Sequence, residues 1–599
     1  MKPPKHTLRW IGAGLVAVGI WLKRRQKQDL RASPSVLRPS HPDKPEPELL
    51  RFDRLQDRVV YSEDDLSGLK EDCSSEGNYR IARLKGIAGN SFTLHVYNGS
   101  PATLQLRVYG RSDDGVKPLT ECIEIREVVK KVKVDGGLPG GGEYIIRFSL
   151  ADNPEEKFDP ADFVALAVYE REPPAQPGIR YRALGNQPTD GPRTVLSFSH
   201  NRKSFQRILL SSCEADGEYL RKWAGRTGLE EAEAYFGPLG SVVVLGIPPG
   251  LDPNTTGGAA ARVRPQKDTI DATAEPDYIV NARHPDDPTN REGDVDKSPT
   301  GPRGDSEPVF RPHTKFDRDR TPIVVSVVDG GVDYSVHNRN HWEPSRYDRP
   351  LESEFVKTGG LGYDFIGKDK EPQDEAPHGT YVAGAIIGGY RAEAPLKMVH
   401  FKIFGEEAIS SYFGALVGIF EAATVKSTII NMSWGMYAEK APPALQCALE
   451  AAVKQGCYLV ASAGNDTTNI DKTPQWPAGF STVSTFKKHL ITTAAYHYDG
   501  KPTADAVRLS KFSNYGPRRV TVAAYETTRV PEFNSGDTTF PLGTSISAPI
   551  VTARLAQFLA DNPGATLSDF AGLYERAPSL SSSVAGQAYL PMNQGETVG

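Results

Sequence analysis

The sequence predicts an α/β protein whose main domain is a mostly parallel sheet flanked by helices, preceded by a small α+β domain and an all-β domain. Strand-like and helical runs alternate from residue 319 to 563, as they do when helices cover a parallel sheet. Residues 323–328 are apolar at all positions but one, which is typical of a strand buried on both faces. Between residues 59 and 172 the apolar residues alternate instead, as in half-buried antiparallel strands.

The composition is that of a globular chain of several domains. Of its 599 residues 38% are hydrophobic and 24% charged, which excludes wholesale disorder. A net charge of −5 offers no basic field, so we expect no nucleic acid partner. The cysteines show neither zinc-ligand spacing nor the density of a disulfide scaffold. We interpret all five as buried or idle thiols of a reducing compartment: Cys73, Cys122, Cys213, Cys447 and Cys457.

The first 30 residues have the character of a membrane anchor. An uncharged stretch, residues 10–22, lies between basic residues on both sides. It has the length of a signal-peptide core and is short for a spanning helix, which needs about 20 residues. Because Lys23, Arg24 and Arg25 stand where a cleavage site would be, we favour a retained single-pass anchor over a cleaved signal. The predicted location is therefore a membrane, on a side that the flanking charges leave undecided.

The remaining chain divides by composition. Residues 31–58 read as a polar linker and residues 59–172 as a β-sandwich-like domain, for which contact with a protein partner or spacing is the expected role. Residues 194–280 mix strand-like and helical runs. Residues 281–318 lose nearly all apolar content and form an exposed linker, a natural place for proteolysis. Residues 564–599 read as a C-terminal tail rich in serine and alanine.

Three short segments of the main domain carry residues suited to nucleophilic catalysis. Asp329 ends the apolar strand, His378 opens a helix, and Ser545 lies at the start of another helix. A serine hydroxyl needs a base to take its proton, and histidine is the side chain poised near pH 7 to do so. A buried carboxylate fixes the imidazole tautomer. Asn465, in the segment ASAGND, could donate its amide to a developing oxyanion.

The segments resemble those of the subtilisin-like serine proteases, or subtilases, in which the triad follows the order Asp, His, Ser. The resemblance covers residues 321–563, and its fragments are VVDGGVD, PHGTYVAGAI, NMSWG, ASAGN, FSNYGP and GTSISAP. It implies a subtilisin-like fold and a serine endopeptidase that cuts polypeptides through an acyl-enzyme. It implies that Asp329, His378 and Ser545 form the triad, and that Asn465 with the backbone N–H of Ser545 forms the oxyanion hole.

The resemblance also implies a substrate-binding cleft. Its residues would be Ser433, Trp434 and Gly435, as an edge strand that pairs with the substrate backbone, and Ala463 and Gly464, which would line the pocket for the side chain before the scissile bond. Gln475, before Trp476-Pro477, corresponds to a position near the base of that pocket and hints at tolerance for polar side chains. We expect no cofactor; calcium occurs in many subtilases, but no ligand cluster here can be assigned to it.

Residues 194–280 resemble, more weakly, the propeptide of the same family, mainly through their order of elements and the closing AEPDYIV. The chain would then be a zymogen whose own propeptide-like domain inhibits it until the linker is cut. An unrelated small α/β domain is the alternative for this segment. For the whole chain the alternative is a catalytically silent subtilase fold that serves as a peptide-binding or scaffold protein.

Overall fold

The computed structural model describes residues 48–50, 79–85, 91–150, 163–169, 203–282 and 310–592, with short gaps inside the longer ranges. Nearly all described residues up to 169 form one compact unit, and all those from 203 onward belong to a second. No helix in these ranges is both long and apolar enough to cross a bilayer. The anchor predicted in residues 1–30 lies outside the described residues.

The first unit is all β, as the sequence predicts. One sheet has the strand order β1-β9-β3-β7 and the other β2-β8-β4-β5, with β6 paired to β4. The strands are β1 (Glu48–Leu50), β2 (Tyr79–Lys85), β3 (Phe92–Asn98), β4 (Leu104–Ser112), β5 (Gly115–Pro118), β6 (Ile123–Ile125), β7 (Val129–Val134), β8 (Glu143–Leu150) and β9 (Phe163–Tyr169). Phe92 of one sheet packs edge to face on Tyr144 of the other, with ring centroids 4.8 Å apart. Because β1 pairs with β9, the predicted linker 31–58 is wrong over Glu48–Leu50.

The second unit begins with a small domain, residues 203–282, whose antiparallel strands follow the order β11-β12-β10-β13. Its elements are β10 (Lys203–Ser212), α4 (Gly217–Thr227), β11 (Glu230–Phe236), β12 (Ser241–Gly246), α5 (Pro253–Arg262) and β13 (Ala272–Asn281). Both helices pack on the sheet, and Trp223 of α4 donates its indole N–H to the carbonyl of Ala260 in α5 at 2.9 Å. This is the α+β composition predicted for the segment.

The large domain, residues 310–592, is built on one sheet of order β15-β16-β14-β18-β20-β22-β24-β28-β27. Neighbouring strands are parallel from β15 to β28, whereas β27 and the side strand β23 pair antiparallel. The strands are β14 (Ile323–Asp329), β15 (Gly362–Asp364), β16 (Leu396–Lys402), β18 (Ile429–Met432), β20 (Tyr458–Ser462), β22 (Leu490–Tyr498), β23 (Val507–Leu509), β24 (Val522–Tyr525), β27 (Glu575–Arg576) and β28 (Ala588–Tyr589). The predicted, mostly parallel sheet is confirmed.

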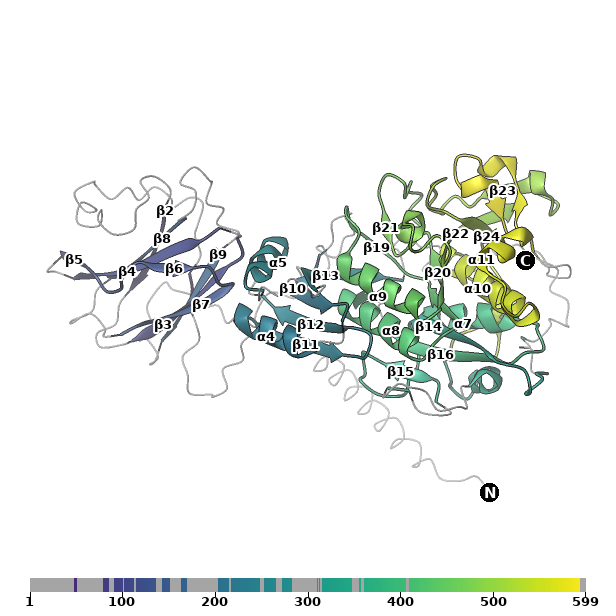
Figure 1. Cartoon of the computed structure of the whole chain (residues 1–599), viewed down its shortest axis with the longest axis horizontal. Helices are drawn as coiled ribbons and strands as arrows, with labels where there is room; N and C mark the ends of the chain where they lie inside the picture. The colour runs from purple at the N-terminus through teal and green to yellow at the C-terminus, as the bar shows by residue number, and fades with distance from the viewer. Residues whose placement is uncertain are drawn as a thin grey trace, which may run out of the picture. The chain divides into compact units, whose positions relative to one another are not determined.

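Helices cover both faces of this sheet (Figure 1). They are α7 (Pro377–Gly389) and α10 (Thr544–Asp561) on one face, and α8 (Tyr412–Thr424) and α9 (Pro443–Lys454) on the other. Val324 and Val328 of β14 join the core under α8 and α9, whereas Val325 and Val327 join the core under α7 and α10. Burial on both faces explains why this strand is an almost unbroken apolar run. Short elements complete the domain: α6 (Arg339–Trp342), β17 (Ile409–Ser411), β19 (Met436–Tyr437), β21 (Gln475–Trp476), β25 (Val530–Pro531), β26 (Thr538–Thr539) and α11 (Leu567–Phe570).

Two predicted boundaries of the large domain are wrong. The predicted tail 564–599 is folded as far as residue 592: β28 pairs with β24, and Phe570, Leu580 and Tyr589 are buried. The predicted exposed linker 281–318 contains Phe310, which is buried in the core under α7 and α10. The helices and strands after residue 563 are only two to four residues long, and elements so short show no helix or strand period in the sequence.

The small domain docks on the α8–α9 face of the large domain. Its strand β13 pairs antiparallel with β17, so that β17 becomes the fifth strand of the small sheet. Tyr235 stacks on Phe420 and donates a hydrogen bond from its hydroxyl to Glu421 at 2.6 Å. Leu209 and Val244 of the small sheet belong to the same apolar core as α8 and α9. The interface therefore combines a shared core, a shared sheet and buried hydrogen bonds.

Two carboxylates of β13 satisfy helix N-termini in the large domain. Glu275 Oε1 accepts the backbone N–H of Ala444 at 2.7 Å, in the first turn of α9. Asp277 Oδ1 accepts the backbone N–H of Phe413 at 3.1 Å, in the first turn of α8. First-turn N–H groups have no partner within their own helix, so each carboxyl group satisfies one of them. Each carboxylate thus supplies a helix cap from a different domain.

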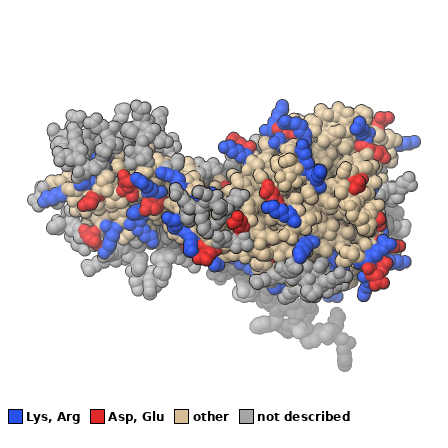
Figure 2. Space-filling view, in the orientation of Figure 1, with Lys and Arg blue, Asp and Glu red and all other residues tan. Residues whose placement is uncertain are grey.

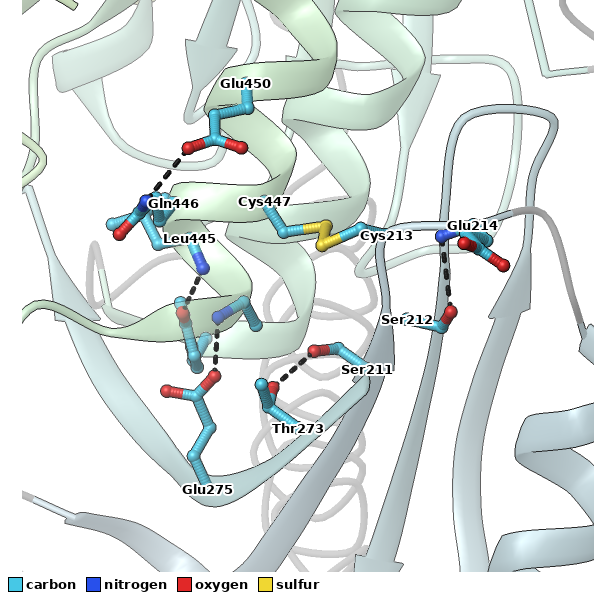
Figure 3. Close-up of a disulfide and its surroundings, with 12 residues drawn as sticks. Ser211, Ser212, Cys213, Glu214, Thr273, Glu275, Leu445, Gln446, Cys447 and Glu450 are labelled. Carbon is cyan, nitrogen blue, oxygen red and sulfur yellow. Dashed lines mark hydrogen bonds between the residues drawn. A yellow bond between two sulfur atoms is a disulfide. The ribbon is translucent and has the colours of Figure 1, made fainter. Parts of the chain in front are cut away.

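A disulfide joins the two domains. Cys213, directly after β10, is bonded to Cys447 of α9, with the two Cα atoms 5.4 Å apart (Figure 3). The prediction that all five cysteines are idle thiols is therefore wrong, and Cys122 is also disulfide-bonded. The prediction holds for Cys457, which is free and buried. A sequence separation of 234 residues leaves no spacing pattern for such a pair, since only docking brings the two cysteines together.

Charged side chains of both signs are interspersed over the face of the large domain that Figure 2 presents. Among the described residues no group of three or more histidine, cysteine, aspartate or glutamate side chains has a metal-binding arrangement.

Candidate active site

The first two predicted catalytic residues are hydrogen-bonded to one another. Asp329 is the last residue of β14 and His378 the second residue of α7, and both side chains are buried. His378 Nδ1 lies 2.7 Å from Asp329 Oδ1, which also accepts the backbone N–H of Gly330 at 2.7 Å. A carboxylate in this position holds the Nδ1–H tautomer, because only a protonated Nδ1 can donate to it. Nε2 is then the ring nitrogen that can act as a base.

A close approach of two backbone segments brings these residues together. A Cβ on Gly379 would lie 2.4 Å from the carbonyl oxygen of Gly331. This distance is too short for any side chain to be accommodated at position 379. Glycine at this position therefore lets the start of α7 pack directly on the turn after β14. This contact explains why glycine follows His378 in the fragment HGT and why glycine follows Asp329 in the fragment DGG. The sequence pattern alone did not indicate that the two fragments touch.

Asp374 supports the segment that carries His378, and the sequence reasoning missed it. Its Oδ2 accepts both the backbone N–H and the hydroxyl of Thr380, at 2.8 and 2.6 Å, and its Oδ1 accepts the backbone N–H of Ala376 at 3.2 Å. Burial, against the opposing effect of these hydrogen bonds, raises the pKa of Asp374 to about 7. Asp374 lies two residues before the N-cap residue Ala376, so the usual N-cap preference for aspartate does not point to it.

Ser545 and Asn465 face the same space. Ser545 is the second residue of α10, and Gly543, just before the helix, has a φ of +148°. A Cβ on Gly543 would lie 3.1 Å from Ser545 Oγ and 3.4 Å from Asn465 Nδ2. Thr544 donates from its backbone N–H and its hydroxyl to Asn465 Oδ1, both at 2.9 Å. These bonds fix the Asn465 side chain, and its amide nitrogen lies on the same side of Gly543 as the Ser545 hydroxyl.

The hydroxyl of Ser545 is buried and forms no hydrogen bond within the described part of the chain. Helices α7 and α10, which carry His378 and Ser545, pack on one another in the same core. The structure thus joins Asp329 to His378 directly and Asn465 to the start of α10, without a bond between the hydroxyl and the imidazole.

The predicted pocket residues lie around Gln475. A Cβ on Gly435 would lie 2.4 Å from Gln475 Nε2, and a Cβ on Gly464 would lie 2.6 Å from the same atom. The Gln475 side chain therefore fills the space between the two glycine-bearing segments. It is only 6% exposed, and its Oε1 has no hydrogen-bond partner among the described residues.

Ser433 and Trp434 lie between β18 and β19, and their side chains point inward. Trp434 donates its indole N–H to the carbonyl of Val328 at 2.9 Å, and Ser433 Oγ accepts from the Asn431 amide at 3.0 Å. A role in substrate binding would therefore use their backbone groups. Ala463 is fixed through its carbonyl, which accepts the Asn514 amide at 2.8 Å.

Asn514 orders the loop that carries Asn465, a role that sequence reasoning missed. Its Oδ1 accepts the backbone N–H groups of Asp466 and Thr468 at 3.0 and 2.8 Å. The fragment FSNYGP contains Asn514 and was the available signal, although nothing in the sequence says what the amide contacts.

Comparison with known proteins identifies the large domain. The model of the subtilase family matches residues 320–588. The major intracellular serine protease of Bacillus subtilis (strain 168) is 30% identical over 246 residues, which cover 39% of this chain and 67% of that relative. The chain belongs to the subtilase family. This confirms the resemblance inferred from the active-site fragments.

Other subtilases match shorter parts of their own length. The epidermin leader peptide-processing serine protease EpiP of Staphylococcus epidermidis is 28% identical over 225 residues, which cover 34% of this chain and 47% of that subtilase. A crystal structure of EpiP from Staphylococcus aureus is 17% identical, with a TM-score of 0.42, over 64% of this chain and 96% of that structure. The chain spans 36% to 47% of the length of three curated relatives that it matches.

Proposed function

We propose that the chain is a serine endopeptidase of the subtilisin type, made as a zymogen that its own small domain inhibits. The observation that carries the proposal is the buried hydrogen bond between Asp329 and His378, together with family membership. Ser545 attacks the carbonyl carbon of a peptide bond, and His378 Nε2 takes the hydroxyl proton. The imidazolium then gives that proton to the leaving amine, and the acyl-enzyme is hydrolysed by water in the reverse sequence.

Asn465 and the start of α10 supply the electrostatic part of this mechanism. As the tetrahedral intermediate forms, negative charge develops on the former carbonyl oxygen. The Asn465 amide and the backbone N–H of Ser545 are the donors proposed for it, and fixed donors need no reorganisation when the charge appears. The positive end of the α10 dipole adds to the same effect.

The small domain is proposed as the inhibitory propeptide. It covers α8 and α9, and its strand β13 occupies the free edge of β17. An edge strand is a site where an extended peptide can pair, so β13 would compete with substrate there. Cutting the chain between residues 283 and 309, inside the predicted linker, would break the backbone connection between the small domain and the large domain.

A serine-directed fluorophosphonate probe tests the catalytic part of the proposal. After the linker is cut and the small domain removed, the large domain should be labelled at Ser545 and should hydrolyse an unstructured protein substrate. The same sample denatured before addition of the probe is the control. A folded, propeptide-free large domain that takes up no label and cuts no peptide would favour the scaffold alternative.

Gln475 is expected to set the preference for the residue before the scissile bond. Because its buried Oε1 lacks a hydrogen-bond partner in the described part of the chain, a substrate with a donor side chain before the scissile bond, such as glutamine, should be cut about tenfold faster than one with leucine. Gln475→Ala should reverse this order by removing the acceptor and enlarging the pocket. The measurement is kcat/KM on paired peptides, with the exposed Gln455→Ala as the control. Unchanged selectivity in Gln475→Ala would contradict this assignment.

Docking of the small domain is expected to weaken as pH rises. Burial raises the pKa of Glu275 to about 8, and raises that of Asp277 to about 6 against the attraction of Arg207, whose Nη2 lies 2.9 Å from Asp277 Oδ2. Both carboxyl groups therefore bind protons more tightly when the small domain is docked than when it is dissociated. In the dissociated state their pKa values are about 4. Docking should be tightest below pH 4 and should weaken up to about pH 8, by at most tenfold per pH unit for each titrating carboxyl.

The measurement is the dissociation constant between pH 5 and 9, in a Cys213→Ser chain whose linker has been cut so that only non-covalent contacts remain. Glu275→Gln with Asp277→Asn is the matched control and should give a much flatter profile. Affinity that rises with pH would show that the two carboxyls are ionised in the docked state.

A further inference from the structure

The disulfide between Cys213 and Cys447 crosses the interface that the proposed activation must open. Cys213 belongs to the small domain and Cys447 to α9 of the large domain. In Figure 3 the bond reaches α9 from the end of β10, while Glu275 approaches the first turn of the same helix. The disulfide and the Glu275 cap therefore both attach the small domain to the same helix, α9.

We propose that this disulfide keeps the small domain on the large domain after the linker is cut, so that the active site is released only when a dithiol reduces it. The proposal rests on the zymogen function above and adds a second requirement to it. Cutting between residues 283 and 309 breaks the chain at one place, but the two fragments remain one molecule through the Cys213–Cys447 bond.

The Cys213–Cys447 disulfide prevents the small domain from dissociating on dilution after the linker is cut. The remaining contacts are non-covalent: the pairing of β13 with β17, the caps at α8 and α9, and the contacts of Tyr235 with Phe420 and Glu421. A fragment held only by such contacts dissociates when its concentration falls below the dissociation constant. A tethered fragment instead keeps an effective concentration in about the millimolar range and rebinds each time it leaves. Inhibition therefore persists at any protein concentration.

The two cysteine residues differ in exposure, which favours one of them as the first to be attacked by a reductant. Cys447 is only 5% exposed, whereas Cys213 is partly exposed. The thiolate of the dithiol attacks Cys213 Sγ and forms a mixed disulfide, and Cys447 leaves as a thiolate that takes up a proton. The second thiol of the reductant then displaces Cys213. The protein disulfide gains two electrons and two protons, and the dithiol is oxidised to its own disulfide.

The test uses the full chain with a recognition sequence for an unrelated site-specific protease placed between residues 283 and 309. Three forms are cut: the otherwise unaltered chain, Cys213→Ser, and Cys457→Ala, which changes the free buried thiol as a control. Each is diluted to nanomolar concentration with or without dithiothreitol. Fragment release is followed by size-exclusion chromatography and by denaturing gels without reductant. Labelling by the fluorophosphonate probe is followed in parallel.

Without dithiothreitol the unaltered chain and Cys457→Ala should stay one species on denaturing gels, and should be labelled at least tenfold more slowly than after reduction. Cys213→Ser should separate and be labelled at the same rate with or without dithiothreitol. Separation of the unaltered cut chain without reductant would overturn the proposal, as would labelling of that chain at a rate that dithiothreitol leaves unchanged. If Cys213→Ser does not fold, the unaltered chain with and without reductant decides.

Failure of the proposed protease function gives a different result. In that case the fragments would still separate only after reduction, but the separated large domain would take up no label. Size and labelling are thus independent readouts, one for the tether and one for catalysis.

Discussion

Replacing Ser545 by alanine is expected to lower kcat for peptide hydrolysis by about a million-fold, the magnitude typical of losing the nucleophile of a catalytic triad. The substitution removes the oxygen that forms the acyl-enzyme and leaves the start of α10 otherwise intact. The unaltered chain should cut itself between residues 283 and 309, whereas Ser545→Ala should remain whole. Intact mass and N-terminal sequencing of the two purified chains measure this directly.

Ser547→Ala is the matched control for this variant. Ser547 lies on the same helix, and its hydroxyl donates a hydrogen bond to the carbonyl of Tyr525 at 3.0 Å. It should lose some stability and keep its catalytic rate to within a few-fold. If Ser545→Ala were cut at the same position and rate as the unaltered chain, another protease would be responsible for processing.

Replacing Asp329 by asparagine is expected to lower kcat at neutral pH by about 10⁴-fold, with a nearly unchanged melting temperature. An amide can present its N–H group to His378 Nδ1, which then becomes an acceptor and shifts the ring proton to Nε2. A protonated Nε2 cannot take the proton of Ser545. Steady-state kinetics at pH 7 and thermal unfolding of the same samples separate the loss of rate from a loss of fold.

Asp374→Asn is the comparison that isolates the tautomer effect. Asp374 is equally buried and lies near Asp329, but its oxygens accept from Thr380 and Ala376 and not from the imidazole. This variant should lose stability, because an amide cannot accept all three bonds, and should lose far less activity than Asp329→Asn. Equal losses of rate in the two variants would mean that both act through the position of α7.

Much of the fold and the site could be predicted from the sequence, because the determining patterns are local. The apolar run of β14 predicts a strand buried on both faces. The strand also fixes the position of Asp329, because this residue is its last. His378 and Ser545 each lie at the second position of a helix that their neighbours predict. Alternation predicted the all-β unit, and the short fragments around Asp329, His378, Asn465 and Ser545, with NMSWG and FSNYGP, predicted the family.

Features that depend on docking between distant segments could not be predicted. Nothing near Cys213 in sequence indicates Cys447, and nothing in AEPDYIV indicates that Glu275 and Asp277 cap helices that begin more than 130 residues later. The role of Asn514 is similar, since its amide contacts backbone groups of Ala463, Asp466 and Thr468, which come near only after folding. The segment after Pro563 was predicted to be a tail because it is rich in serine and alanine, although its elements are only two to four residues long and bury Phe570 and Tyr589.

The Cys213–Cys447 bond also closes a covalent loop of 234 residues in the uncut chain. Asp329 and His378 lie inside this loop, whereas Asn465 and Ser545 lie outside it. Closing a loop of that length restricts the unfolded chain by an entropy worth about 5 kcal/mol, so the uncut molecule resists global unfolding. A cut between residues 283 and 309 opens the loop and returns that freedom to the unfolded state. Processing would therefore make the protein easier to unfold before any fragment has left it.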